Sequence, residues 1–185
     1  MRAVNPHDLI SFWFGRDRKA WFEKNPAFDE EIRRRFLGLY ERGAAGELAH
    51  WQRAPADCLA LVILLDQFPR NMFRGSARAF ASDPPARAAA DVILGNGWDK
   101  AMSPDERMFA YLPFEHSESL ADQERCLALM REIAVFPESV DLPKWAEAHL
   151  AIIRRFGRFP HRNAALGRTS TPEEAEFLKQ PGSSF

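Results

Sequence analysis

The sequence is poor in cysteine and in net charge, and each shortage excludes a class of protein. Its two cysteines, Cys58 and Cys126, provide neither a zinc-binding spacing nor a disulfide framework. Both fall in apolar helical patterns, which predict buried free thiols. A formal net charge of −1 lacks the basic excess of general nucleic-acid and membrane binders. We therefore expect no nucleic-acid partner and no membrane partner.

Long apolar runs and nucleotide-binding motifs are also missing. The most apolar run, residues 59–65, is too short to cross a bilayer, and the N-terminus lacks the apolar core of a signal peptide. No phosphate-binding loop, nucleophile elbow or dinucleotide fingerprint occurs. These absences predict a soluble cytoplasmic protein without a cofactor, and they leave enzymatic activity open.

Helical periodicity dominates the remaining pattern. No segment keeps a period-two alternation, and 46% of the residues are hydrophobic, which is enough for a substantial core. Start signals of a capping residue followed by proline stand at Asn5, Asn25, Ser103 and Thr171. We predict an all-α fold of antiparallel helix pairs, packed as a tetratricopeptide-like superhelix or a compact helical array, in a single domain over residues 1–185.

Three details of this helical scheme can be compared with a structure. The helix opened by Pro55 is apolar on every side through Leu65, which predicts a central, buried helix. The helix that follows Ser103 is expected to stop at Pro113. A stripe formed by Trp145, His149, Ile152 and Phe156 is expected to face the core.

Two segments in which a proline follows a phenylalanine are dense in polar groups. In the first, residues 65–75, Asp66 is a candidate catalytic carboxylate, and Gln67, Arg70 and Asn71 are candidate ligand-binding residues. A buried carboxylate is costly unless it is paired, so an ion pair that holds a turn is the alternative. The second segment, residues 158–168, contains the candidate ligand-binding residues Arg158, His161, Arg162 and Asn163.

An acidic segment, residues 115–124, contains two further candidate catalytic residues. His116 with flanking acids fits a general base, and Glu118 is the other candidate. A metal site formed by these two residues with His149 and His161 is a weaker hypothesis, because no metal-binding spacing is present. We therefore assign no metal ligand. Structural hydrogen bonding of the histidines is the plainer interpretation.

Arginine outnumbers lysine, and five arginines lie between residues 154 and 172 without an acid. The planar guanidinium suits paired hydrogen bonds to phosphate or carboxylate groups. This segment therefore predicts a site for a small anion. The alternative is an internal network with the acidic segment 115–124, and the sequence does not separate the two.

Several of these motifs together resemble a known family. Residues 12–15, 65–71, 79–83, 111–118, 122–123 and 155–163 resemble the bacterial domain-of-unknown-function family number 924. The resemblance spans nearly the whole chain. It implies an all-helical fold similar to tetratricopeptide-repeat superhelices, and it implies no activity, cofactor or catalytic residue.

Three functions follow from these patterns. The first is a polar pocket for a small anionic molecule, either an enzyme site or a binding site. The second is a tetratricopeptide-like module that binds another protein, for which exposed tryptophans would serve as anchors. The third is a metal-dependent hydrolase. Burial of the tryptophans is the observation that separates the first two.

Overall fold

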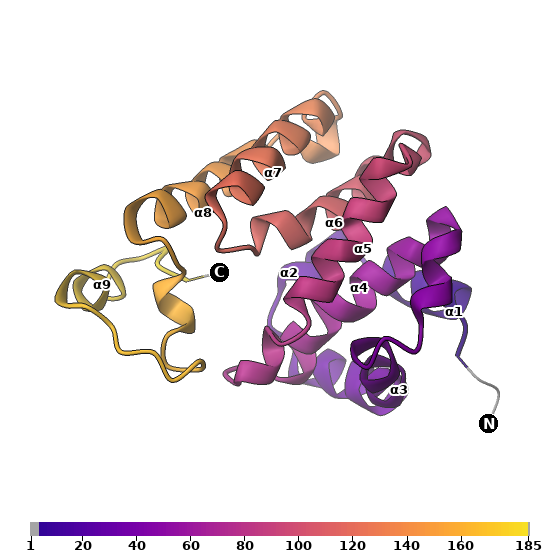
Figure 1. The fold of residues 1–185 in the computed structure, drawn as a ribbon, viewed down its shortest axis with the longest axis horizontal. Helices are drawn as coiled ribbons and strands as arrows, with labels where there is room; N and C mark the ends of the chain where they lie inside the picture. The colour runs from indigo at the N-terminus through magenta and orange to yellow at the C-terminus, as the bar shows by residue number, and fades with distance from the viewer. Residues whose placement is uncertain (1–3, 185) are drawn as a thin grey trace. The chain divides into compact units, whose positions relative to one another are not determined.

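The computed structural model of this chain describes residues 4–184, and within that range all regular structure is helical, without a strand (Figure 1). The α-helices are α1 Pro6–Phe14, α2 Arg18–Phe22, α3 Pro26–Ala44, α4 Pro55–Met72, α5 Asp83–Gly95, α6 Pro104–Glu115, α7 Leu120–Ile133, α8 Leu142–Phe156 and α9 Pro172–Phe177. Short 3₁₀ turns connect them: η1 Ala49–Arg53, η2 Ala77–Ala79, η3 Trp98–Ala101, η4 Pro137–Ser139 and η5 Pro160–Arg162. The all-α prediction is confirmed.

Local capping explains where several helices begin. The Asn5 side chain accepts the Asp8 N–H at 2.9 Å, and the Asp8 carboxylate accepts the Asn5 N–H at 3.2 Å, which forms a capping box. Asn25 accepts two backbone N–H groups at the start of α3. Thr171 and Glu174 repeat the capping box at α9. These starts lie where the capping residues predict them.

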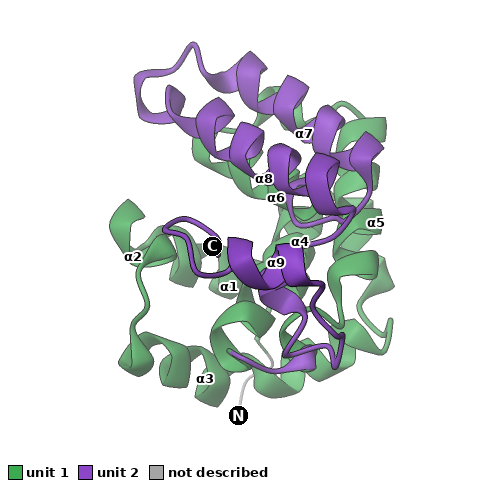
Figure 2. Ribbon diagram, turned by 90° about the vertical axis from the view of Figure 1, so that its left-hand side faces the viewer, with its two compact units in different colours: residues 1–74, 78–113 green, residues 75–77, 114–185 purple. Residues whose placement is uncertain are grey.

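The chain divides into two compact units (Figure 2). The first comprises residues 1–74 and 78–113, and the second comprises residues 75–77 and 114–185. Each unit is described by itself below. The single domain expected over residues 1–185 stays a prediction.

Helix α4 forms the core of the first unit. Residues 58–69 are all buried, and α4 packs against α1, α3, α5 and η1. An α-helix with apolar residues on every side needs neighbours on every side, and this arrangement supplies them. The prediction of a central helix is confirmed. None of the helices within residues 4–184 is both long enough and apolar enough to span a membrane.

Two prolines that look like helix ends lie inside helices. Helix α4 continues through Pro69 to Met72, and α6 continues through Pro113 to Glu115, so the predicted end of α6 is wrong. Proline lacks the N–H that would bond the carbonyl four residues earlier. At Pro69 that carbonyl belongs to Leu65, and the Ser82 hydroxyl donates to it at 2.6 Å instead. The side chain of Ser82, the N-cap residue of α5, thus compensates for the missing bond.

In the second unit α7 and α8 pack side by side (Figures 1 and 2). The buried face of α8 includes Ala146, His149, Leu150 and Ile153. Trp145 is 53% exposed, so its predicted place on the core stripe is wrong. His149 and Ile152 of the same predicted stripe are buried, so the departure is confined to the first turn of α8.

Candidate functional site

In the first unit, the polar residues at the end of α4 form an ion-pair cluster. The Arg70 guanidinium donates two hydrogen bonds to Asp83, at 2.9 and 3.1 Å, and one to the Asp66 backbone carbonyl at 2.6 Å. It also lies 3.3 Å from the Asp66 carboxylate. Gln67 donates to the other Asp66 oxygen at 2.7 Å. Asp66 is only 1% exposed, and Arg70 supplies positive charge beside this buried carboxylate.

The next turn of α4 is tied to α3 by a second carboxylate. Asn71 donates to Asp29 at 2.8 Å, and Arg74 holds the same carboxylate at 2.6 and 2.9 Å. Arg33 of α3 in turn donates to the Met72 carbonyl. These bonds close the C-terminal end of α4 against its neighbour.

These contacts give the first segment an internal role. Burial lowers the pKa of Arg70, but the charges of Asp66 and Asp83 outweigh burial and raise it, so the guanidinium stays charged. The hydrogen-bonding groups of Asp66, Gln67, Arg70 and Asn71 are directed at other protein groups. The arrangement is that of the ion pair that the sequence offered as the alternative to a ligand site.

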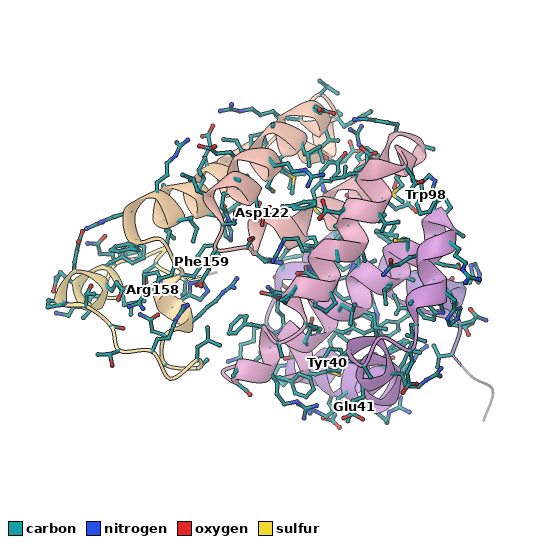
Figure 3. All side chains as sticks on the ribbon, viewed as in Figure 1. Tyr40, Glu41, Trp98, Asp122, Arg158 and Phe159 are labelled. Atoms are coloured by element: carbon teal, nitrogen blue, oxygen red, sulfur yellow. The ribbon has the colours of Figure 1, made fainter. Side chains whose placement is uncertain are left out.

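In the second unit, Phe159 is the centre of the polar residues. It lies just after α8, next to Arg158 (Figure 3), and is fully buried. Its N–H donates to Glu118 at 2.8 Å, and its carbonyl accepts from Arg168 at 3.1 Å. Its ring lies 4.5 Å from the guanidinium carbon of Arg162, an attractive cation–π distance. Phe159 therefore contacts three charged side chains, Glu118, Arg168 and Arg162.

Arg158 is held by a carboxylate that the sequence presented only as a helix cap. It donates to both oxygens of Glu174, at 2.6 and 2.7 Å, and to the Thr169 carbonyl at 3.0 Å. Asn163 donates to Glu174 at 3.2 Å and to Ser170 at 3.1 Å. Hydrogen bonds from Arg158 are the largest influence on Glu174 and lower the pKa of this carboxyl to about 2. Glu174 is therefore a structural anion.

Glu118 is held in the same way by Arg168. The two side chains form paired hydrogen bonds of 2.8 and 3.0 Å, and Arg168 also donates to Asn163 at 3.0 Å. Burial raises the pKa of Glu118, but the bonds from Arg168 and the Phe159 N–H prevail and lower it. Glu118 is thus a stable carboxylate, which suits a positioning role better than proton transfer.

His149 is buried and neutral. Burial is the main cause that lowers its pKa from 6.5 to about 3, and its Nδ1 donates to the Trp145 carbonyl at 2.9 Å. Nδ1 also lies 3.4 Å from a Glu115 oxygen, within ion-pair distance. Because the imidazole carries no charge at neutral pH, we regard this contact as polar rather than ionic. Nε2 of this tautomer is an acceptor.

Other basic side chains lie near this neutral imidazole, and two of them share the Phe159 ring with it. Positive charge on His116, His161 and Arg162 contributes to the lowered pKa of His149, and Arg162 acts on Glu118 as well. The rings of His161 and His149 lie 5.5 and 5.7 Å from that of Phe159. We call His116, His149, His161 and Arg162 the histidine–arginine cluster.

Metal and thiol chemistry find no support among the described residues. Within residues 4–184, no group of three or more His, Cys, Asp or Glu side chains is arranged to hold a metal ion. The arrangement of His116, Glu118, His149 and His161 thus gives the metal-dependent hydrolase no geometric support. Cys58 and Cys126 are buried free thiols, and burial raises the pKa of Cys58 to about 12.

The carboxylate partners were the residues that sequence reasoning missed. Asp83, Asp29 and Glu174 pair with Arg70, Arg74 and Arg158, although each also carries an ordinary helix-start signal. Arg168, the partner of Glu118, closes the second Phe-Pro segment but was not among the candidates. An acid in the first turn of a helix is readily explained as part of the helix cap, and the neighbouring sequence does not indicate that it also pairs with a distant arginine.

The fold and these contacts describe an all-helical protein whose charged side chains bind mainly one another. The chain belongs to the family described as bacterial proteins of unknown function (DUF924), whose model matches residues 9–182. A solved structure, the protein of unknown function ATU0120 from Agrobacterium tumefaciens, is 42% identical. The similarity covers 94% of this chain and 96% of that one, with a TM-score of 0.87. None of the curated proteins compared matches the chain.

Proposed function

We propose that the second unit binds a small anion, a phosphate or a carboxylate, at the histidine–arginine cluster. The observation that carries the proposal is the placement of Arg162, His161 and His149 against the ring of Phe159, at 4.5, 5.5 and 5.7 Å. A guanidinium and two imidazoles on one aromatic ring bring N–H donors close together, and such donors favour an anionic ligand. Arg162 is 6% exposed, and low exposure strengthens its attraction for an anion.

The neighbouring arginines are already hydrogen-bonded to carboxylates of the protein. Arg158 and Arg168 each form paired hydrogen bonds with a carboxylate, so they act as supports for the site. Arg162 lies over Phe159, with its guanidinium carbon 4.5 Å from the ring centre. His149 lies against the same ring, at 5.7 Å. A base with a pKa of about 3 is weak at neutral pH, so binding fits this cluster better than base catalysis.

Ligand-dependent thermal stabilisation tests this proposal. Inorganic phosphate should raise the melting temperature above that measured in chloride of equal ionic strength. A ligand at a hundred times its Kd increases the free energy of unfolding by about 2.7 kcal/mol. Arg162→Gln should abolish the increment, and Arg162→Lys should retain part of it. Arg154→Gln is the matched control, because Arg154 is exposed and pairs with Glu124 at 3.0 Å. Equal phosphate stabilisation of wild type and Arg162→Gln would disprove the assignment.

A second function, binding to another protein, is favoured by one specific observation. Four large apolar side chains are exposed around the turn between α7 and α8, namely Val135 (77%), Phe136 (38%), Val140 (62%) and Trp145 (53%). Exposed tryptophan beside aliphatic residues is typical of interaction surfaces. Glu138 and Asp141 lie in the same turn, so the partner that fits is an apolar segment with basic side chains.

A lysine- and leucine-rich amphipathic peptide is a suitable probe of this second function. Titration followed by NMR should shift the signals of residues 135–145, and Val140→Asp should suppress the shifts. Signals that do not move, or that move equally over the whole surface, would count against a docking surface. Self-association of the chain without peptide would identify a second copy as the occupant instead.

A further inference from the structure

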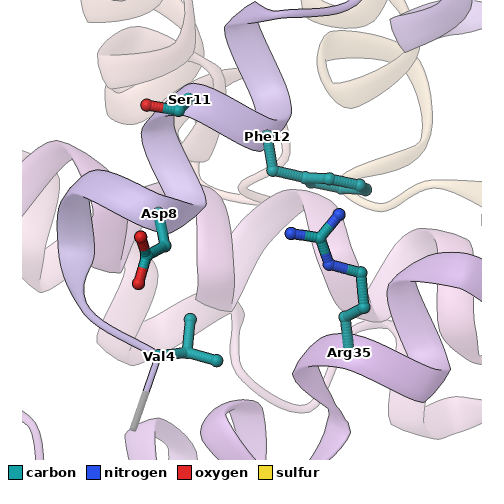
Figure 4. Close-up of a pocket in the computed structure, with 5 residues that line it drawn as sticks. All are labelled: Val4, Asp8, Ser11, Phe12 and Arg35. Carbon is teal, nitrogen blue, oxygen red and sulfur yellow. The ribbon is translucent and has the colours of Figure 1, made fainter. Parts of the chain in front are cut away.

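A depression between α1 and α3 of the first unit has the features of a separate binding site. It encloses about 400 Å³ and is lined by Val4, Asp8, Ser11, Phe12 and Arg35 (Figure 4). Asp8, Ser11 and Phe12 are spaced i, i+3 and i+4, so they share one face of α1. We call this feature the α1–α3 depression, and it contains none of the residues of the histidine–arginine cluster.

The positively charged side of the depression is the guanidinium of Arg35, which lies near two aromatic rings. The guanidinium carbon of Arg35 lies 4.4 Å from the centre of the Phe12 ring and 5.2 Å from that of Phe36. Among residues 4–184, its one hydrogen bond is to Glu31 at 3.3 Å, while Glu31 holds Arg16 more closely at 2.5 Å. A guanidinium has five N–H donors, so donors remain for a ligand carboxylate.

The anionic wall is Asp8, which lies across the depression from Arg35 (Figure 4). One of its oxygens accepts the Asn5 N–H at 3.2 Å. Within the described chain, the other oxygen makes no hydrogen bond. Asp8 and Arg35 thus face the same space without bonding to each other.

A second depression in the same unit shows why this separation matters. It encloses about 460 Å³ and also contains an acid and a base, Asp105 and Arg18. There the two side chains lie 2.8 Å apart and neutralise each other. The α1–α3 depression keeps its two charges apart, so both are available to one ligand.

We propose that the α1–α3 depression binds the zwitterion of a short peptide, of dipeptide size. The C-terminal carboxylate would bind Arg35, the N-terminal ammonium would bind Asp8, and an apolar side chain would lie against Phe12 and Val4. Within the described residues Asp8 and Arg35 form no ion pair with each other, so a ligand whose two charges lie on separate residues suits them better than an α-amino acid. Two extended residues span about 7 Å. A volume of about 400 Å³ is within the range of small-molecule sites.

Calorimetric titration of the full chain with the dipeptide Ala-Phe tests this proposal. N-acetyl-Ala-Phe removes the ammonium, Ala-Phe-amide removes the carboxylate, and free phenylalanine shortens the distance between the charges. Each change should weaken binding by about tenfold to a hundredfold, the range expected for one charged hydrogen bond. Arg35→Gln and Asp8→Asn should weaken Ala-Phe binding equally, and Asn at position 8 keeps a side-chain oxygen for the cap.

Arg34→Gln is the matched control, because Arg34 is the exposed neighbour of Arg35 and does not line the depression. It should leave the affinity unchanged, as should Arg162→Gln, which separates this site from the proposed anion site. The proposal is overturned if Ala-Phe gives no saturable heat at about 10 mM, ten times the Kd of about 1 mM expected for two exposed charged contacts. Equal binding of the acetylated peptide would also overturn it.

Discussion

Two segments of this protein share a proline after a phenylalanine and an Arg-Asn pair, yet they do different things. Phe68 to Asn71 lies within α4, whereas Phe159 to Asn163 forms the 3₁₀ turn η5 and its flanks. In the helix, Arg70 is directed at two carboxylates. In the turn, Arg162 is directed at the ring of Phe159, while Arg168 takes up Glu118. The same residue pattern therefore places its arginine against two carboxylates in the helix and against an aromatic ring in the turn.

The largest expected effect comes from removing the ion pair of the first segment. Arg70→Met leaves Asp66 and Asp83 without their shared cation, and breaking a buried pair from one side costs about 3–5 kcal/mol. Urea unfolding followed by circular dichroism measures this loss. Arg74→Met is the matched control, because Arg74 is 38% exposed and its pair with Asp29 should contribute no more than about 1 kcal/mol.

The same substitution in the second segment should separate the two roles. Under the proposed function, Arg162→Met should remove the stabilisation by phosphate, whereas Arg70→Met should lower stability but leave the response to phosphate intact. If Arg162→Met instead kept the full response to phosphate, both segments would be structural. The contrast between them would then fail.

A medium effect should appear in the pH dependence of stability, and it should come from the second unit. His149 has a pKa of about 3 when folded and 6.5 as the reference value. Below pH 6.5 the unfolded chain therefore binds a proton that the folded chain does not, and stability falls as the pH falls. The pKa values of Glu118 and Glu174 are lowered, so their losses begin only below about pH 4.5.

Between pH 6.5 and 4.5 the loss due to His149 should be about 2 kcal/mol, since each pH unit contributes at most about 1.4 kcal/mol. Urea unfolding at a series of pH values measures it. His149→Gln should flatten the profile over this window, and His50→Gln, an exposed histidine of the first unit, should not. An unchanged profile in His149→Gln would show that another group titrates there.

The sequence predicts the fold better than the site for a physical reason. Helix starts depend on neighbours within four residues, so Asn5, Asn25 and Thr171 reveal them. The pairing of charges depends on distant partners. Arg168 lies 50 residues from Glu118, and composition alone does not select it among 20 arginines. The continuation of α4 through Pro69 likewise depends on Ser82, which lies 17 residues from the carbonyl that it completes.

The smallest expected effect tests that last compensation directly. Ser82→Ala leaves the buried Leu65 carbonyl without its donor and should cost about 1–2 kcal/mol. In a Pro69→Ala background the new backbone N–H can bond Leu65, so the same substitution should cost about 1 kcal/mol less. The contact of Ser82 with the Tyr40 hydroxyl, at 3.3 Å, is lost in both backgrounds and cancels in the double-mutant cycle. Urea unfolding of the four proteins measures the coupling. A coupling of zero would mean that Ser82 stabilises the chain independently of Pro69. The first segment would then need no side-chain hydrogen bond to compensate for its proline, and in this respect it would not differ from the second segment, whose proline stands in a 3₁₀ turn.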